Sequence, residues 1–170
     1  MNVLRTILAA REAGNVLRCH TIPHHGEYSV ALHCYNVVSL LFILHPDPSV
    51  NLIKAALWHD AGERWVGDIP APAKWASPEL DTASKVAEHI ARDKFGLNGG
   101  ELSEEDRGWL GVLDALEFWF WCLDQEALGN QHINNARRAI RDRLNREDLS
   151  LYPGVWQVVR TLAWTRLEEA

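Results

Sequence analysis

The sequence is poor in cysteine and has no long apolar run. Its three cysteines, Cys19, Cys34 and Cys122, are far apart and form no C-x-x-C pair. This pattern excludes a disulfide framework and a cysteine-rich zinc site, and it favours reduced thiols. No stretch approaches the ~18 apolar residues of a membrane-spanning helix, and residues 1–13 lack the cleavage pattern of a secretion signal. We therefore expect a cytoplasmic protein, in the host cytoplasm if a phage encodes it, with no membrane partner.

Positive charge is also scarce. The formal net charge is −6 and the pI is about 5.7. A protein that binds a nucleic-acid polymer needs a basic stripe to neutralise the phosphate backbone, so we expect no such partner. A small anion requires only a few local cations. Small phosphate compounds therefore stay open as ligands.

Apolar residues are plentiful and follow a helical spacing. They make up 47% of the 170 residues, which is enough for one domain to bury a core without disulfides. Alternating runs typical of strands are scarce. We therefore predict an all-α fold, a single compact domain over residues 1–170 with about six to seven helices. The expected helices cover residues 2–13, 27–44, 49–62, 78–96, 103–128, 131–145 and 153–168.

Two prolines mark an irregular segment after the third predicted helix. Pro70 and Pro72 lack backbone donors and restrict the residues before them. We therefore predict a rigid loop, not a helix, over residues 67–72.

Histidines interrupt the apolar faces of two predicted helices. His33 lies three residues after Val30 and four before Val37, which places it on the core face of the second helix. His59 follows the apolar residues Ala55 and Ala56 of the third helix by four and three residues, and Asp60 follows it directly. Taken alone, each histidine is more often a hydrogen-bonded core residue than a metal ligand. The repetition of the pattern favours a common ligand.

An aspartate occupies an apolar face of the fifth predicted helix. Asp114 lies among Leu110, Leu113, Phe118 and Trp121, where an unpaired buried charge costs on the order of several kcal/mol. One divalent cation would compensate it and would also bind the two imidazoles and Asp60. Such a mixed nitrogen and oxygen site accepts cobalt, manganese, zinc, nickel or iron. A hydrogen-bonded core aspartate is the alternative.

The segment 59–74 adds further acids to this group. Glu63 follows His59 by four residues and is predicted to share its helical face, whereas Asp68 lies in the proline-stiffened loop. Both are placed to reach a water molecule on the metal. A purely structural metal site has no need of such acids, which favours catalysis over a non-catalytic metal- or nucleotide-binding module.

This segment, with His33 before it and Asp114 after it, resembles the HD superfamily, whose pattern is a histidine, a His-Asp pair and a distant aspartate. The resemblance spans nearly the whole chain. It is closer to the bacterial HD-domain 5′-deoxynucleotidases and to short phage relatives that include dATP triphosphohydrolases. It implies an HD-domain helical bundle that hydrolyses deoxynucleotides. The implied metal ligands are His33, His59, Asp60 and Asp114, and the implied acid/base residues are Glu63 and Asp68.

The resemblance also implies the substrate contacts. Arg18 and Lys74 match the residues that bind substrate phosphate, and a second, phosphate-bound magnesium ion is a further candidate cofactor. The nucleotidases carry a tryptophan after the loop arginine, but Cys19 follows Arg18 here. Contact with the base then falls to other residues, each of which could equally serve packing. The candidates are His20, Ile22 and Trp75.

The substrate is expected to be a small deoxynucleotide. The short chain and the loop 20–23 resemble the phage proteins more than the longer bacterial nucleotidases, and this resemblance implies a dATP or dNTP triphosphohydrolase that releases deoxynucleoside and triphosphate. The alternative is a 5′-deoxynucleotidase acting on deoxynucleoside monophosphates. A guanosine tetraphosphate hydrolase ranks third because Arg64, not aspartate, follows Glu63. A metal-free helical interaction protein is a fourth interpretation.

Eight tryptophans exceed what one small core easily buries, which predicts a homo-oligomer. The candidate interface is the last predicted helix, and ordinary core packing is its alternative. Its apolar residues are Val155, Val158, Val159, Leu162 and Trp164.

Overall fold

The computed structural model describes residues 2–168 and the side chains of residues 2–162. Within this range the regular secondary structure is helical, apart from one isolated antiparallel bridge between Leu17 and Ser29. The all-α prediction is confirmed. The longer helices are α1 (Val3–Ala13), α2 (Val30–Leu44), α3 (Val50–Trp58), α6 (Pro78–Phe95), α7 (Glu104–Ala127), α8 (Asn134–Arg146) and α9 (Pro153–Glu168).

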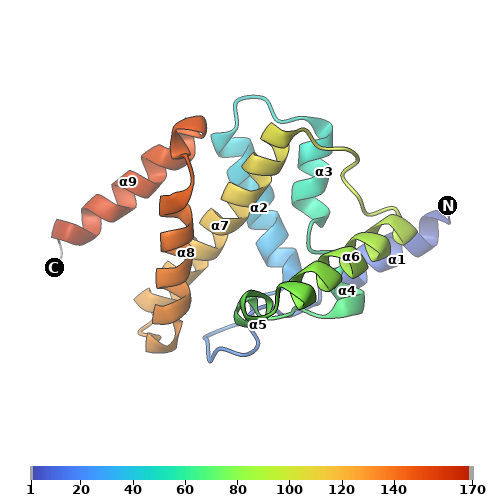
Figure 1. Ribbon diagram of the computed structural model, residues 1–170, viewed down its shortest axis with the longest axis horizontal. Coiled ribbons are helices and arrows are strands. Elements are labelled where there is room, and N and C mark those ends of the chain that lie inside the picture. Colours follow the sequence, from blue (N-terminus) through green and yellow to red (C-terminus); the bar gives the residue numbers. More distant parts are fainter. Residues whose placement is uncertain (1, 169–170) are drawn as a thin grey trace.

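The helices form a bundle around α2 and α7. In Figure 1 these two helices run through the middle of the molecule, with α1, α4 and α6 toward one end and α8 and α9 toward the other. The short 3₁₀ helices Gln131–Ile133 and Leu149–Leu151 precede α8 and α9. None of the helices in the described residues is long and apolar enough to cross a membrane.

Polar side chains set several helix starts where the sequence predicts them. Ser49 and Ser103 accept hydrogen bonds from the backbone N–H groups of Leu52 and Asp106, both at 3.0 Å. At the other end of α6, Gly96 adopts a left-handed φ of 67° that closes the helix.

The second helix begins later than predicted. Its first residue is Val30 and not residue 27, because residues 28–30 pair with residues 16–18. The N–H of Arg18 donates to the carbonyl of Tyr28 at 2.8 Å, and the N–H of Val30 donates to Val16 at 2.9 Å. Ser29 then caps the helix.

The region after α3 also differs from the prediction. The third helix ends at Trp58, so His59 and Asp60 lie in a turn and not on one helix with Glu63. The His59 carbonyl accepts from the Arg92 guanidinium on α6 and is not part of a helical ladder. Two short helices follow, α4 (Glu63–Val66) and α5 (Ala71–Ala76), which raise the helix number above the six to seven expected.

The prediction of a loop over residues 67–72 was wrong in its last part. Residues 67–70 are irregular, but α5 begins at Ala71 with Pro72 in its first turn. Proline is tolerated there because the first N–H groups of a helix have no intrahelical acceptor.

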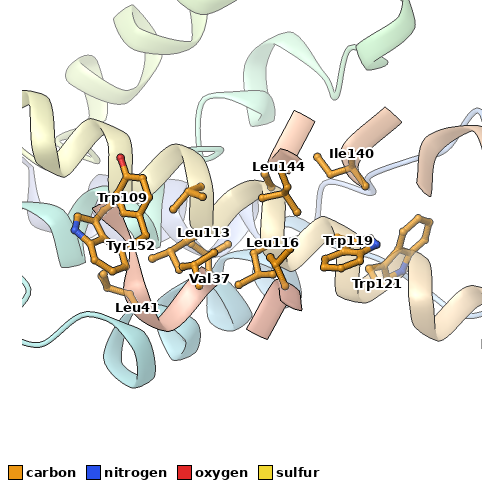
Figure 2. Close-up of a cluster of buried hydrophobic side chains, with 14 of the residues drawn as sticks. Val37, Leu41, Trp109, Leu113, Leu116, Trp119, Trp121, Ile140, Leu144 and Tyr152 are labelled. Atoms are coloured by element: carbon orange, nitrogen blue, oxygen red, sulfur yellow. The ribbon is translucent and has the colours of Figure 1, made fainter. Parts of the chain in front are cut away.

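The main core lies between α2, α7, α8 and α9. Figure 2 shows Trp109 and Tyr152 at one end of a cluster that continues to Trp119 and Trp121 at the other. Three of the tryptophans, Trp109, Trp119 and Trp121, are therefore buried. The buried aliphatic residues between them include Val37, Leu41, Leu113, Leu116, Ile140 and Leu144.

A second, smaller cluster lies under α1 and the turn after α3. Its buried members are mostly alanine, and Trp58 and Phe95 pack against them. The four buried members are Ala9, Ala13, Ala61 and Leu97. The residues that carry polar chemistry lie between the two clusters.

The last helix divides between core and surface. Val155 and Val159 are buried in the main core, as the alternative interpretation expects. Val158 and Leu162 are partly buried and pack against that core. Trp164 lies outside the residues whose side chains are described.

Candidate metal centre

Four predicted ligands meet between α2, the turn after α3, and α7. The Nε2 atom of His33 lies 3.1 Å from Nε2 of His59, 3.5 Å from Oδ2 of Asp60 and 3.3 Å from Oδ1 of Asp114. His59 Nε2 lies 3.4 Å from Asp60 Oδ2 and 4.0 Å from Asp114 Oδ1. The structure therefore brings two imidazoles and two carboxylates to one point.

The Nδ1 atom of each imidazole already has a hydrogen-bond partner. His59 Nδ1 lies 3.0 Å from the carbonyl of Ala56, which can only accept a hydrogen bond, so Nδ1 donates. His33 Nδ1 faces the Glu117 carboxylate in the same way. In the neutral rings both Nε2 atoms then carry lone pairs, and these face each other at 3.1 Å. A divalent cation that accepts both lone pairs would satisfy the two Nε2 atoms.

The donor set fits a divalent ion. Imidazole and carboxylate ligands lie about 2.0–2.2 Å from a bound zinc ion, which places neighbouring ligand atoms roughly as far apart as those of His33, His59 and Asp60. The candidate ligand atoms of these three residues all lie within 4.8 Å of one another. Asp114 is the fourth member of the set, through its contact with His33.

Glu117 completes the support of His33, and the sequence analysis missed it. It is 3% exposed and also accepts from the Tyr28 hydroxyl and, at 3.1 Å, from the Asn36 amide. A carboxylate behind a metal-binding histidine fixes the tautomer and the ring orientation. The available signal was its position three residues after Asp114, on the same face of an otherwise apolar helix.

The carboxylates make this site attractive to positive charge. Burial lowers the pKa of both histidines, but Asp114 and Glu117 raise that of His33 to about 9, and Asp60 raises that of His59 to about 9. Burial works against ionised Asp60 and Asp114 as well, yet the histidines hold both pKa values below their usual range.

Arg18 and Glu63 lie beside the ligand set. The Arg18 guanidinium forms an ion pair with Asp60, and its Nη1 lies 4.0 Å from Oε1 of Glu63. Glu63 is 5% exposed, and burial, reinforced by the charge of Asp60, raises its pKa to about 8. Burial thus favours the neutral, protonated form of the Glu63 carboxyl, the form that can donate a proton.

The sequence model of a known protein family matches a segment that includes part of this site. The model, described as 5′-deoxynucleotidase YfbR-like, matches residues 14–98, which is half of the chain. The chain belongs to the YfbR-like 5′-deoxynucleotidase family. The matched segment contains Arg18, His33, the His59-Asp60 pair and Glu63, whereas Asp114 and Glu117 lie beyond it.

Curated relatives agree with the family match. The 5′-deoxynucleotidases of Yersinia pseudotuberculosis and Photorhabdus temperata are 27% and 28% identical to this chain over 103 residues. Each match covers 52% of this chain and 52% of the relative. The chain thus spans about half the length of the curated relatives it matches.

Solved structures identify the fold. An HD-domain phosphohydrolase from Listeria innocua has a TM-score of 0.75 at 20% identity and covers 99% of this chain and 90% of its own. The HD phosphohydrolase of cyanophage S-2L, bound to dA and one catalytic zinc ion, has a TM-score of 0.69 at 16% identity, with 95% and 96% covered. The family member described here therefore has the HD-domain fold.

Asp68 is tied to the loop that carries Arg18. Its Oδ2 accepts from the backbone N–H of Cys19 at 2.9 Å and lies 3.5 Å from His20 Nδ1. Cys19 has a φ of 56°, a left-handed conformation that is uncommon outside glycine. The structure thus gives Asp68 a contact that positions the loop, beyond the acid/base role predicted for it.

The remaining predicted contacts lie around this loop and α5. Lys74 Nζ lies 3.8 Å from Oε1 of Glu88, so its charge is partly matched within the chain. Among the base-pocket candidates, Ile22 packs against the main core, the His20 side chain is 48% exposed and Trp75 is 68% exposed.

Proposed function

We propose that the protein is a metal-dependent phosphohydrolase that cleaves the bond between the 5′ oxygen and the α-phosphorus of deoxynucleotides. The observation that carries the proposal is the facing pair of Nε2 atoms on His33 and His59, with both Nδ1 atoms engaged elsewhere. Membership of the 5′-deoxynucleotidase family supports the substrate class.

The proposed metal ligands are His33, His59, Asp60 and Asp114. A divalent ion held by these residues would lower the pKa of a bound water to about 7 and would polarise a phosphoryl oxygen. The zinc ion of the cyanophage protein supports zinc, and the mixed ligand set also suits cobalt, manganese, nickel or iron. A second magnesium ion on the phosphates remains part of the proposal.

The remaining residues bind charge and move a proton. Arg18, beside Asp60, neutralises the α-phosphate and can bind two of its oxygens at once. Glu63 donates a proton to the 5′ oxygen, which is too basic to leave without one. Lys74 is a second phosphate contact, and His20, Ile22 and Trp75 are the candidates for the base. Glu63 also argues against a non-catalytic module, since a structural metal site has no need of a further acid that supports none of its ligands.

Two substrate classes share this chemistry. Hydrolysis of dATP releases deoxyadenosine and triphosphate, and hydrolysis of a deoxynucleoside monophosphate releases orthophosphate, but both break the same bond. The names of the curated relatives support the monophosphate, whereas the dA bound to the cyanophage structure supports an adenine base without indicating a phosphate number.

The test is turnover with defined products. Purified protein is incubated with dATP, dAMP and the other deoxynucleotides in the presence of cobalt, manganese or zinc, and the products are separated chromatographically. Deoxynucleoside release is expected from the wild type and from Asp142→Ala, an exposed control, but not from Asp60→Ala. Absence of turnover with every metal would overturn the enzyme proposal and favour a binding module.

We also propose that the protein self-associates through the surface of α2 and α9. Ile43 is 75% exposed and Phe42 is 58% exposed. Ile43 borders a hollow of about 490 Å³ between these helices, and the occupant that we propose is a second copy of the chain.

Light scattering should show an oligomer that Ile43→Asp dissociates. A monomeric wild type would contradict the proposal. The hollow is lined by Ile43, Leu44, Phe120, Gly154, Gln157, Val158, Thr161 and Leu162.

A further inference from the structure

A second arginine approaches the ligand set from α8. Arg143 Nη1 lies 3.7 Å from Oδ2 of Asp114, and its Nη2 donates to the carbonyl of Gly111 at 3.2 Å. The other oxygen of Asp114 faces His33. One carboxylate therefore separates Arg143 from the metal centre, as Asp60 does for Arg18.

Arg143 lies beside the most exposed member of the proposed ligand set. The side chain of Asp114 is 30% exposed, compared with 16% for Asp60 and 0% for His33. The side chain of Arg143 is 44% exposed, whereas that of Arg18 is only 14% exposed. An anion that enters the site from solvent therefore meets Arg143 at the rim and Arg18 at depth.

The contacts of Arg143 leave most of its hydrogen-bonding capacity unused. A guanidinium has five N–H donors, and the hydrogen bond that Arg143 makes among the described residues is the one to Gly111. The 3.7 Å separation from Asp114 exceeds the about 2.7–2.9 Å of a charge-assisted hydrogen bond. An exposed ion pair of this kind contributes little to folding stability, typically about 0–1 kcal/mol. Stability alone therefore does not account for its placement.

The direction of the substrate follows from Glu63. If Glu63 protonates the 5′ oxygen, the nucleoside lies on the side of Glu63 and Arg18. Arg143, which lies beside Asp114 and not beside Asp60, is then available to the other groups attached to the α-phosphorus. A divalent ion bound by Asp60 and Asp114 would offset both carboxylates, leaving the two arginine charges to be matched by a polyanion.

We propose that Arg143 binds the phosphate groups beyond the α-phosphate, so that a deoxynucleoside triphosphate is the preferred substrate. This inference rests on the proposed phosphohydrolase function. Arg143 lies outside residues 14–98, the segment that matches the nucleotidase family, so it is a feature that the family match does not assign.

The matched control lies on the same helix. Arg141 is also about half exposed, and its guanidinium pairs with the adjacent Asp142, so Arg141→Ala removes an equal charge without touching Asp114. Binding of inorganic tripolyphosphate and orthophosphate to the metal-loaded full chain is measured by calorimetry. Arg143→Ala should weaken tripolyphosphate binding about 10- to 100-fold, while orthophosphate binding stays within about a factor of two. Arg141→Ala should change neither.

Two further readouts separate this inference from the proposed function. Metal affinity should stay the same or rise in Arg143→Ala, because a positive charge beside Asp114 is lost. The kcat/KM for dATP should fall relative to that for dAMP. Equal losses for tripolyphosphate and orthophosphate, or no loss for either, would overturn the role of Arg143. If the wild type hydrolyses no nucleotide but binds tripolyphosphate through Arg143, the enzyme proposal fails and the polyphosphate contact survives.

Discussion

The two halves of the candidate metal centre are built in different ways. His33 and Asp114 project from α2 and α7, whose apolar faces form the large core. His59 and Asp60 lie in a turn that rests on the small, alanine-lined cluster. Side-chain packing therefore places the first pair, whereas backbone contacts place the second.

The turn depends on close approach of the backbone. Arg92 from α6 binds the His59 carbonyl, and a Cβ on Gly62 would lie 2.6 Å from the backbone oxygen of Glu88. The turn also leads directly to Glu63, the proposed acid. On the proposed function, both halves contribute metal ligands, and the turn half also contributes the proton donor. The predictions below separate these two contributions, from the largest expected effect to the smallest.

Replacement of Glu63 should lower the rate of catalysis without changing metal affinity. Glu63→Gln preserves the side-chain shape but cannot give the carboxyl proton to the 5′ oxygen. We expect kcat to fall about 10²- to 10⁴-fold, with metal affinity retained. Glu12→Gln, which removes an exposed carboxylate paired with Arg64, is the control. A kcat within tenfold of the wild type would reject Glu63 as the acid.

Removal of the support behind His33 should affect the helical half. Glu117→Ala is expected to weaken metal binding about 10- to 100-fold, because the imidazole loses the acceptor that fixes its tautomer. It should also lower the free energy of unfolding by about 1–3 kcal/mol, since the buried Tyr28 hydroxyl and Asn36 amide lose their acceptor.

Chelator competition and chemical denaturation measure these two effects. Glu117→Gln keeps an acceptor oxygen and should recover part of the metal affinity. Gln125→Ala, a buried substitution on the same helix whose partners lie in the loop near His25, should destabilise the fold without weakening the metal. Unchanged metal affinity in Glu117→Ala would contradict the role assigned to this carboxylate.

Crowding of the turn should damage metal binding as well as stability. Gly62→Ala and Gly99→Ala both place a Cβ 2.6 Å from a neighbouring Cβ, on Glu88 and Ala55 respectively. Each should lower the free energy of unfolding by about 1–3 kcal/mol. Only Gly62→Ala is expected to weaken metal binding, because Gly99 lies in a loop that contributes no ligand. Equal effects of both variants on metal affinity would remove the distinction between the two halves.

The smallest effect is expected at Asp68. Asp68→Asn keeps an oxygen that can accept from the Cys19 N–H, whereas Asp68→Ala does not. If Asp68 positions the loop, Asp68→Asn should reduce kcat/KM by less than about fivefold, consistent with the modest net free energy of one hydrogen bond. If Asn and Ala are equally inactive, Asp68 acts through its charge or proton, as the sequence pattern predicts.

Much of the fold follows from local sequence signals. Serine caps and helical periodicity predict most helix starts, and Gly96 marks the end of α6. The turn at His59 could not be read in this way, because its cause is Arg92, which is 33 residues later in the chain. The prolines do not predict the short helix α5, because proline disrupts the interior of a helix but is tolerated in its first turn.

The candidate site shows the same division between local and distant information. Apolar spacing around His33 and Asp114 indicates that both side chains face the interior, which the structure shows for His33 at 0% exposure. Spacing alone does not show that they meet. Glu117 was detectable from its position one turn after Asp114, but Arg143 has no local signal, since it reaches the site from another helix.

The bridge between Leu17 and Ser29 closes the loop between them at its base. Hydrogen bonds join residues 16–18 to residues 28–30, which fixes the two ends of the loop beside Arg18 and the start of α2. The free-energy cost of closing a loop rises only slowly with its length. If His20 or Ile22 contacts the base, as proposed, substitutions within residues 20–27 should change base preference while the proposed metal ligands keep their positions.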